Sequence, residues 1–168
     1  VSTEIAPERV LPALAEVAKA AGASGMVGGQ VLDMEYTGKE DVTFEDLETM
    51  HAQKTGALIR CACASGAILA GAEGYHVDAA REYGKQLGAA FQIADDILDE
   101  IGDEKELGKP VGSDREQGKT TYPSLLGMPK SRAFADIHRQ RAINSLTSFS
   151  GEHAIFLKQL ANYVVDRT

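Results

Sequence analysis

The sequence contains no tryptophan, and aromatic residues make up only 6% of its 168 residues. Its apolar content comes mainly from Ala, Leu, Ile and Val, a mixture that suits helices better than strands. No run of alternating apolar and polar residues is long enough to indicate a strand. The length allows one domain with a buried core. We therefore predict an all-α fold.

Positive charge is also in short supply. The chain has 17 Lys and Arg against 25 Asp and Glu, a net charge of -8, and the basic residues form no patch. Binding to nucleic acid requires clustered Lys and Arg, so we expect no nucleic-acid partner. An acidic protein can still bind an anionic substrate if divalent cations stand between the two.

Cysteine is scarce as well, with only Cys61 and Cys63. Residues two apart on a helix do not face each other, so a disulfide between them is not expected, and a zinc site would need more ligands. Two small buried residues in a reducing compartment, and hence a cytoplasmic location, are the prediction.

Long apolar runs are missing from the sequence. No stretch approaches the roughly 20 apolar residues of a membrane span, and no signal peptide is visible. We therefore predict no membrane span. The chain begins at Val1 rather than Met, which tag removal, processing or truncation would each explain.

Helix start and stop signals divide the chain into a series of predicted helices. Pro7 suits a first turn, and Thr43 is a good N-cap, followed by two acids near the positive end of its helix. Residues 56–71 are rich in small side chains, which predicts a buried segment that a neighbouring helix approaches closely. The predicted helices cover residues 7–21, 26–36, 44–70, 77–101, 123–126, 130–147 and 152–167, and residues 102–122 are predicted to form a loop that caps a central cavity.

The segment from Phe91 to Asp99 carries an acidic stripe. At about 100° per residue, Gln92, Asp95, Asp96, Asp99 and Asp103 fall within one arc of about 100°. Like charges at this spacing repel by a few tenths of a kcal/mol per pair, and a cation could offset this. Ligands that offer only oxygen favour a hard ion such as Mg²⁺. A solvated acidic face is the alternative interpretation.

Two lysines, Lys109 and Lys119, lie in the Gly-containing segment that follows the stripe. Lysines in loops are usually only solvated. Beside a metal-binding stripe, however, they could hold phosphate oxygens. The combination of the two features is what indicates a site for a phosphorylated substrate.

Four sequence elements resemble motifs of the trans-polyprenyl diphosphate synthases and follow one another along the chain as those motifs do. The resemblance is closest to bacterial farnesyl diphosphate synthases (geranyltranstransferases). The Phe91–Gln92–x–x–Asp95–Asp96–x–x–Asp99 stripe is similar to the second aspartate-rich motif of that family. The resemblance extends from about residue 7 to residue 167. The other three elements are Gly29–Gln30–x–x–Asp33, His51–x–x–Lys54–Thr55–Gly56, and Gly–x–Asp–x–x–x–Gly–Lys–x–Thr–Tyr–Pro over residues 112–123.

The resemblance implies an isoprenoid synthase helical bundle and a Mg²⁺-dependent prenyltransferase. Such an enzyme ionises an allylic diphosphate (dimethylallyl or geranyl), and isopentenyl diphosphate attacks the carbocation head-to-tail, with release of pyrophosphate. The resemblance also implies three Mg²⁺ ions in each complete active site and a homodimer.

The resemblance further implies a role for each of three aspartates. Asp95 would ligate one Mg²⁺ directly, and Asp99 would stand in its shell through water. Asp96 is the weaker candidate among the metal ligands.

The same resemblance implies roles for cationic and neutral polar residues. Lys54 and Lys119 would bind the diphosphate, and Lys109 would assist at the mouth of the site. Thr55 and Gln92 would line the cavity near the carbocation. The alternative interpretation is that both are core polar residues with satisfied hydrogen bonds. Gln30 and Asp33 are expected to orient their neighbours rather than to contact substrate.

Several features of that family are missing from the sequence. Its chains are about twice as long and carry a first aspartate-rich motif, a Gly–Lys–x–x–Arg element for isopentenyl diphosphate and residues that set product length. We therefore expect residues 1–168 to form the C-terminal half of a single synthase domain, inactive when alone. We also expect apolar surface around Ile59 and Ile68 to be left open to water.

Three other interpretations remain open at this point. A terpene cyclase uses metal-bound diphosphate on a helical fold, but it usually lacks the Gly–Lys–x–Thr–Tyr–Pro segment. A non-catalytic subunit would have no need to keep Asp95, Asp96 and Asp99. A protein that binds only a divalent cation would not need the three lysines.

Overall fold

The computed structural model describes residues 5–101 and 112–167. In these two ranges every regular element is a helix, which confirms the predicted all-α fold. The elements are α1 (Pro7–Ala21), α2 (Met26–Tyr36), α3 (Phe44–His51), the π-helical turn η1 (Ala52–Gly56), α4 (Ala57–Ala70), α5 (Gly74–Ile101), α7 (Ser113–Glu116), α8 (Tyr122–Leu126), α9 (Met128–Ser145), the 3₁₀ turn η2 (Leu146–Ser148) and α10 (Glu152–Asp166).

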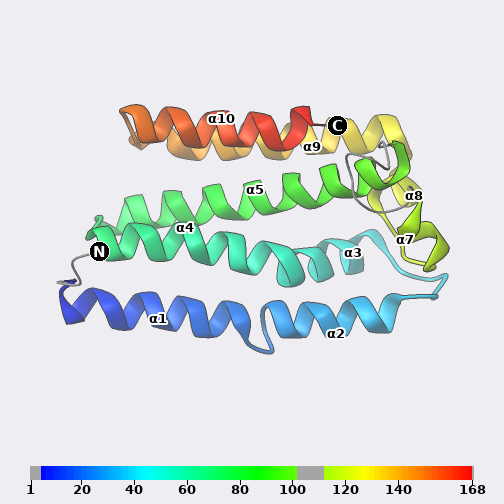
Figure 1. The fold of residues 1–168 in the computed structure, drawn as a ribbon, viewed down its shortest axis with the longest axis horizontal. Helices are drawn as coiled ribbons and strands as arrows, with labels where there is room; N and C mark the ends of the chain where they lie inside the picture. Colours follow the sequence, from blue (N-terminus) through cyan, green and yellow to red (C-terminus); the bar gives the residue numbers. More distant parts are fainter. Residues whose placement is uncertain (1–4, 102–111, 168) are drawn as a thin grey trace.

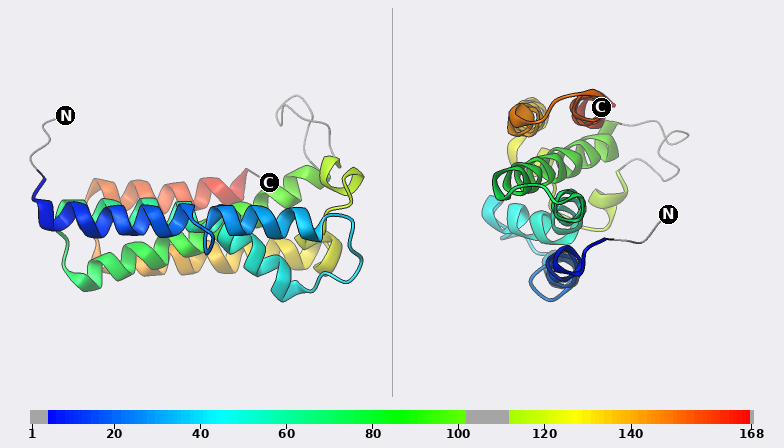
Figure 2. Two further views of the ribbon diagram at one scale, coloured as in Figure 1. Left: turned by 90° about the horizontal axis from the view of Figure 1, so that it is seen from below. Right: turned by 90° about the vertical axis from the view of Figure 1, so that its left-hand side faces the viewer.

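The helices stack in layers along a common direction (Figure 1). Helices α1 and α2 follow each other along one side, and α3, η1 and α4 form the next layer. The long helix α5 lies at the centre, with α9 and α10 on its far side. The end-on view in Figure 2 shows the same order of layers. The most extensive contacts of α5 are with α4 and α9, so this helix carries its residues through the middle of the bundle.

Helices α3 and α4 are one continuous helix with a wide turn, η1, between them. The start is fixed by a capping box: the Thr43 hydroxyl accepts from the Asp46 backbone N–H at 3.2 Å, and the Asp46 carboxylate accepts from the Thr43 N–H at 3.0 Å. Short polar side chains satisfy free backbone donors in this way at helix starts. The predicted helix over residues 44–70 is thus confirmed, while its π-helical interruption was not predicted.

Helices α4 and α5 approach each other closely, as predicted, but the glycines that permit this approach lie on α5, and only one face of α4 is buried. A Cβ atom at Gly84 would lie 2.7 Å from the Cα of Arg60, and one at Gly88 would lie 2.9 Å from the Cα of Gly56. Both distances are shorter than real Cβ contacts. Glycine therefore holds the two backbones together here and sets how far the side chains of α5 reach across the bundle.

The core forms around α5 and the helices on both sides of it. Its fully buried members include Leu47 from α3, Tyr83 from α5 and Leu146 from η2. The Tyr83 hydroxyl donates to the Leu157 carbonyl at 2.8 Å, which ties α5 to α10. Cys61 is buried, Cys63 is half-buried, and both are free thiols, in agreement with the prediction that no disulfide joins them.

The predicted loop over residues 102–122 was partly wrong. Residues 102–111 lie outside the described ranges, but Ser113–Glu116 form the short helix α7. The Asp99 carboxylate accepts from the Ser113 hydroxyl at 2.9 Å and from the Asp114 N–H at 3.0 Å. Because these contacts come from α5, local sequence does not reveal them. Helix α5 also begins at Gly74, three residues before the predicted start at Val77.

The expected location of exposed apolar surface was also wrong. Ile59 and Ile68 are half-buried, and Ile59 packs against the main core. Strongly exposed apolar side chains lie on α1 and α2, with Leu11 71%, Leu14 57% and Met34 70% exposed. Others lie on α10, with Phe156 60% and Tyr163 68% exposed.

By length and composition alone, the stretch Pro7–Tyr36 could cross a membrane, since it contains an 18-residue window with a mean hydropathy of 1.2, 17% of which is buried. No such stretch was predicted from the sequence. It does not form one continuous helix, because the chain is broken into α1 and α2 at residues 22–25. At 1.5 Å per residue each of these two helices is shorter than the roughly 30 Å of a bilayer core. Both also pack on the bundle, α1 against α4 and α2 against η1.

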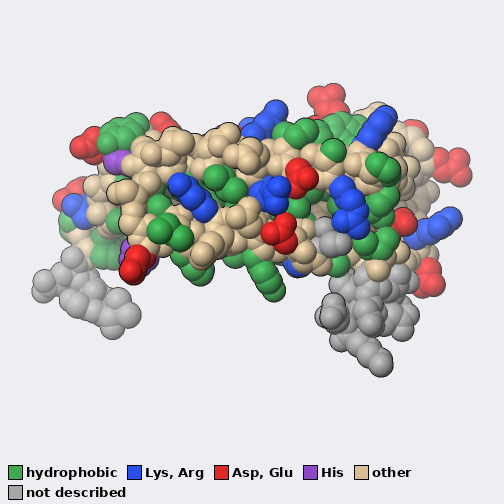
Figure 3. All heavy atoms as spheres, turned by 90° about the horizontal axis from the view of Figure 1, so that it is seen from above, with side chains coloured by type: hydrophobic (Ala, Val, Ile, Leu, Met, Phe, Trp, Pro, Cys, Tyr) green, Lys and Arg blue, Asp and Glu red, His purple; other side chains and the backbone are tan. Residues whose placement is uncertain are grey.

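Charges of both signs are mixed on the surface. On the face shown in Figure 3, Lys and Arg side chains alternate with Asp and Glu side chains and with apolar ones, and no large patch of one sign is seen. Charge on this face therefore singles out no site.

Candidate functional site

A cavity of about 300 Å³ lies between α2, η1, α5 and residues 114–121. It collects six of the residues predicted from sequence, from three separate parts of the chain. Asp99 is not in its wall, and Lys109 lies outside the described residues, so its predicted role stays a prediction. The six predicted residues in the wall are Lys54, Thr55, Gln92, Asp95, Asp96 and Lys119.

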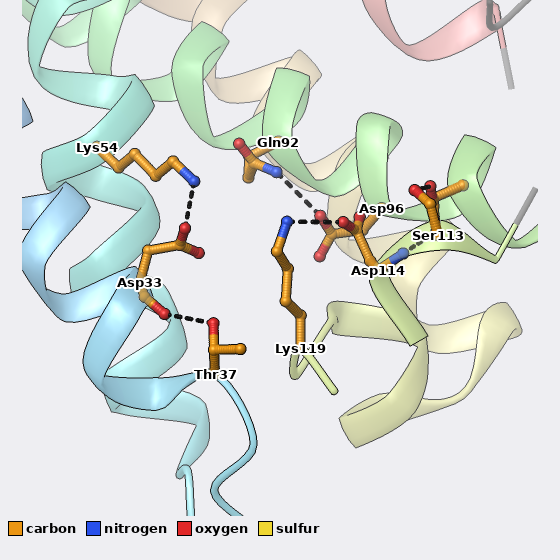
Figure 4. Close-up of polar contacts among 9 residues, drawn as sticks. Asp33, Thr37, Lys54, Gln92, Asp96, Ser113, Asp114 and Lys119 are labelled. Atoms are coloured by element: carbon orange, nitrogen blue, oxygen red, sulfur yellow. Dashed lines mark hydrogen bonds and ion pairs between the residues drawn. The ribbon is translucent and has the colours of Figure 1, made fainter. Parts of the chain in front are cut away.

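Lys54 enters the cavity from η1. Its ammonium pairs with the Asp33 carboxylate on α2 at 2.7 Å, and Figure 4 shows the two side chains meeting across the gap between these elements. Gly29 makes this possible, because a Cβ there would lie 2.2 Å from the Lys54 backbone nitrogen. Asp33 lies one turn beyond Gly29 on the same face of α2. The expectation that Asp33 orients a neighbour agrees with this ion pair.

Lys119 reaches the cavity from the opposite wall (Figure 4). Its ammonium pairs with the Asp114 carboxylate at 3.0 Å, and the lysine side chain is 29% exposed while that of Asp114 is 15% exposed. A lysine ammonium has three N–H donors. The ion pairs of Lys54 and Lys119 therefore fix both ammonium groups and leave donors available to a ligand in the cavity.

A chain of hydrogen bonds crosses the floor of the cavity. The Thr55 hydroxyl donates to Gln92 Oε1 at 2.9 Å, and Gln92 Nε2 donates to Asp96 Oδ1 at 2.9 Å. The backbone N–H of Tyr122 donates to the other oxygen of Asp96 at 2.9 Å. Thr55 and Gln92 thus line the cavity and also form a hydrogen bond with each other. Lining the cavity and having satisfied hydrogen bonds are therefore compatible interpretations of these residues.

Asp96 and Asp99 are each only 2% exposed. Burial raises the pKa of Asp96 to about 7, although the hydrogen bonds from Tyr122 and Gln92 lower it. Both oxygens of Asp99 accept from the segment that begins α7. In the described structure Asp96 therefore connects α5 to Tyr122, and Asp99 holds the start of α7 in place.

Asp95 is the carboxylate of the stripe that suits a metal ion best. It is partly exposed, lines the cavity, and has no hydrogen bond or ion pair within the described ranges. No three His, Cys, Asp or Glu side chains of residues 5–101 and 112–167 are grouped as a metal cage. Mg²⁺ typically takes one or two carboxylates and completes its shell with water and phosphate oxygens. The donor set around Asp95 fits that ion.

Two residues that line this cavity, Asp114 and His51, were given no role in the sequence-based predictions. Asp114 lies within the matched motif over residues 112–123, but its pairing with Lys119 was not predicted. A carboxylate five residues before a lysine gives no signal of pairing unless the turn between them is known. His51 also lines the cavity, and burial lowers the pKa of its imidazole to about 3, so the ring is neutral. Its spacing of three residues from Lys54 was the available signal.

The arrangement of these helices has close counterparts among solved structures. A polyprenyl synthase from Caulobacter crescentus, complexed with calcium and isoprenyl diphosphate, superposes with a TM-score of 0.89 at 26% identity, covering 95% of this chain and 60% of the other. An FPP/GFPP synthase from Zymomonas mobilis gives a TM-score of 0.81 at 33% identity, covering 95% of this chain and 52% of the other. The fold is therefore that of the isoprenoid synthases.

Residues 5–150 match the polyprenyl synthetase family, and the chain belongs to that family. Among curated relatives, geranylgeranyl pyrophosphate synthase 11 of Arabidopsis thaliana is 42% identical over 165 residues, which is 97% of this chain and 46% of the relative. The chain thus spans about half the length of the curated relatives it matches. The predicted family is confirmed. The closer resemblance to farnesyl diphosphate synthases is not confirmed, because the names of the relatives refer to synthases with different products.

Proposed function

We propose that the protein carrying this chain is a Mg²⁺-dependent prenyltransferase. It would condense an allylic diphosphate, dimethylallyl or geranyl, with isopentenyl diphosphate head-to-tail and release pyrophosphate. Membership of the polyprenyl synthetase family supports the reaction class. The observation that carries the proposal is the cavity itself, where Lys54, Lys119 and Asp95 converge from three elements.

The two lysines bind the diphosphate in this proposal. Lys54 and Lys119 each keep ammonium donors free beyond the carboxylates that position them. Charge-assisted hydrogen bonds to phosphate are among the stronger polar contacts in proteins. Because the lysines stand on opposite walls, they can hold the leaving pyrophosphate between them while negative charge grows on it.

Asp95 would hold a Mg²⁺ ion, with Asp99 acting through water and Asp96 as a weaker contributor. Three Mg²⁺ in each complete site are part of the proposal, and carboxylates outside this chain would share in holding them. When bound, Mg²⁺ supplies positive charge that stabilises the pyrophosphate as it leaves. The hydrogen bonds of Asp96 and Asp99 to Tyr122 and α7 support positioning roles for these two residues.

Thr55 and Gln92 face the region where the allylic carbon would sit. Their hydroxyl and amide groups are neutral, and their hydrogen bond to each other keeps the dipoles fixed. Fixed neutral dipoles stabilise a carbocation without attacking it, provided that bulk water is excluded. Lys109 would assist at the mouth of the cavity, as the resemblance implies.

A farnesyl-length product is the finer part of the proposal. It rests on the sequence resemblance alone, since the named relatives include synthases of longer products. Chromatography of the products made from geranyl diphosphate and isopentenyl diphosphate by the protein carrying this chain is the measurement. Accumulation of geranylgeranyl diphosphate as the main product would contradict it.

A homodimer in the cytoplasm is also proposed for the protein carrying this chain. The cytoplasmic location rests on the low cysteine content of the sequence. Light scattering during size-exclusion chromatography measures the assembly, and a mass equal to one chain would contradict the dimer. Fractionation of the source cells measures the location.

The lysine assignment is tested by binding rather than by turnover. Lys54→Gln and Lys119→Gln should each weaken binding of an unreactive thio analogue of geranyl diphosphate, measured with Mg²⁺ by calorimetry. Loss of a hydrogen bond to a charged group, about 1.5–3 kcal/mol, corresponds to a change of about 10- to 100-fold in Kd. Lys19→Gln, at an exposed lysine on α1, is the matched control. Unchanged binding in both cavity variants would disprove their roles.

A further inference from the structure

The turn directly before Lys119 is a closed backbone motif that ends helix α7. Gly118 has a φ of +68°. Its N–H donates to the Arg115 carbonyl at 3.0 Å, and the N–H of Lys119 donates to the Asp114 carbonyl at 2.9 Å. Two bonds of this kind define a Schellman motif, in which glycine suits the left-handed position. Gly118 therefore sets the direction in which the chain leaves α7 at Lys119.

This motif joins the same two residues that form the ion pair in the cavity. The Lys119 ammonium pairs with the Asp114 carboxylate at 3.0 Å, as Figure 4 shows. Asp114 is held in turn by α5, because its backbone N–H donates to the Asp99 carboxylate at 3.0 Å. Lys119 is thus attached to α7 through its backbone and through its side chain. A change in the turn at Gly118 would disturb both attachments.

Gly118 also joins the two walls of the cavity. Its carbonyl accepts from the N–H of Gly38 at 2.9 Å. Gly38 lies two residues beyond the end of α2, the helix that carries Asp33, and Asp33 pairs with Lys54. One backbone hydrogen bond therefore connects the helix that positions Lys54 to the segment that carries Lys119.

The need for glycine at this contact comes from backbone conformation rather than from lack of space. A Cβ at Gly118 would lie 3.4 Å from the Cα of Gly38, an ordinary van der Waals distance, and a Cβ at Gly38 would meet nothing within 4 Å. The φ of Gly38 is +78°, also in the left-handed region. Alanine is strained at such a φ, whereas asparagine tolerates it. The two substitutions therefore separate conformation from space.

We propose that Gly118 is a positioning residue for the diphosphate site. Its turn and its bond to Gly38 hold Lys119 at a fixed separation from Lys54, so that both ammonium groups reach one diphosphate. This inference rests on the proposed function and adds to it how the second lysine is placed. Two cations already at the right separation bind without first ordering a segment of chain, which favours binding.

The test measures binding of the unreactive thio analogue of geranyl diphosphate, with Mg²⁺, to variants of the protein carrying this chain. Gly118→Ala should raise its Kd about 10-fold, because the strained turn no longer holds Lys119 in place. Gly118→Asn should bind to within about 3-fold of the parent, because asparagine accepts the left-handed φ. Equal Kd values for Gly118→Ala and the parent, or equal losses in the two variants, would overturn the proposal.

A matched control is available at the end of another helix. Gly71 ends α4 in the left-handed conformation, with a φ of 76°. At 1.5 Å per residue it lies about 20 Å along α4 from η1. Gly71→Ala should therefore strain a comparable turn and leave the Kd unchanged. Circular dichroism and thermal unfolding establish that each variant is folded.

A double-mutant cycle distinguishes positioning from a general structural role. If Gly118 acts through Lys119, Gly118→Ala should add no further loss of binding in a Lys119→Gln background. A further loss of about 10-fold in that background would refute the proposal. Unchanged binding in Lys119→Gln itself would contradict the proposed function and this inference with it. A loss in Lys119→Gln without one in Gly118→Ala would overturn this inference alone.

Discussion

At the residue scale, the three aspartates of the acidic stripe share a motif but not an environment. Asp96 and Asp99 are buried, and both oxygens of each accept protein hydrogen bonds. Asp95 is partly exposed and lines the cavity. Identical side chains on one helix thus have different surroundings: Asp95 borders the cavity, while Asp96 and Asp99 also hold neighbouring segments in place.

Replacing Asp95 by Asn in the protein carrying this chain should slow pyrophosphate release by about two to three orders of magnitude, because a charge that holds Mg²⁺ is lost. The rate is measured with saturating allylic diphosphate and Mg²⁺. Asp78→Asn is the control, since Asp78 lies on the same helix about 25 Å away. Near-normal turnover of Asp95→Asn would rule out its role as a ligand.

His138 should make stability depend on pH. Its pKa is about 4 in the folded chain because of burial, against an ordinary value of 6.5. Between these values the unfolded chain binds the proton more readily, so stability falls as the pH drops from about 6.5 to 4 and is fully present above 6.5. We expect His138→Gln to remove on the order of 1–2 kcal/mol of this pH dependence at pH 5.

The measurement for His138→Gln is urea unfolding at pH 7 and at pH 5, compared between the variant and the parent. His153→Gln, at an exposed position on α10, should leave the parent's pH dependence intact. Because His51 is buried and neutral in the same way, some dependence should persist in His138→Gln. An unaltered slope in that variant would show that His138 does not contribute.

At the element scale, the contact between α2 and η1 decides where Lys54 stands. Gly29 touches the backbone of η1, and Asp33, one turn later, holds the lysine ammonium. Both elements therefore have to keep their spacing for the ion pair to form. A glycine at this crossing serves close approach, as the glycines at the crossing of α4 and α5 do.

Gly29→Ala should destabilise the chain by about 1–3 kcal/mol, because its Cβ would overlap the backbone of Lys54 and push α2 away from η1. Chemical unfolding of the parent and the variant gives the difference. Gly66→Ala is the matched control, since a Cβ there meets nothing within 4 Å and alanine favours the helix. Equal stability of Gly29→Ala and the parent would contradict the close-contact explanation.

Most helix bounds were predictable, and the reasons are local. Pro7 and Thr43 mark starts through their own backbone and side-chain chemistry, and α1 and α2 match the predicted ranges. Helix α7 and the π-helical turn were not predictable, because each depends on contacts with another element. The predicted cavity residues of one motif share a helix face because of their spacing, whereas the approach of Lys119, which lies between α7 and α8, depends on tertiary contacts.

At the scale of the whole molecule, the described site has its metal-binding carboxylate on one helix. A pyrophosphate held by several metal ions needs ligands on two sides, and the sequence has a single aspartate-rich motif. The related proteins that match over this chain are about twice as long. The apolar side chains of α1 and α2 are also left open in the described structure.

The 168-residue chain assayed alone should therefore form no detectable product from an allylic diphosphate, isopentenyl diphosphate and Mg²⁺. The sample is verified by mass spectrometry and by circular dichroism, so that loss of fold is distinguished from an incomplete site. Its open apolar surface should also make it self-associate as concentration rises. Turnover comparable to that of a full-length family member would refute this prediction.

The wide turn η1 has a consequence for changes in chain length. A π turn amounts to an α-helix with one inserted residue. Because the wide turn takes up the extra residue, Leu47 and Met50 on α3 still face the core. Deleting one residue within η1 should therefore restore a regular helix and leave α3 close to its present orientation. A deletion within the regular helix α4 would instead rotate α3 by about 100° relative to the rest of α4 and turn Leu47 and Met50 out of the core.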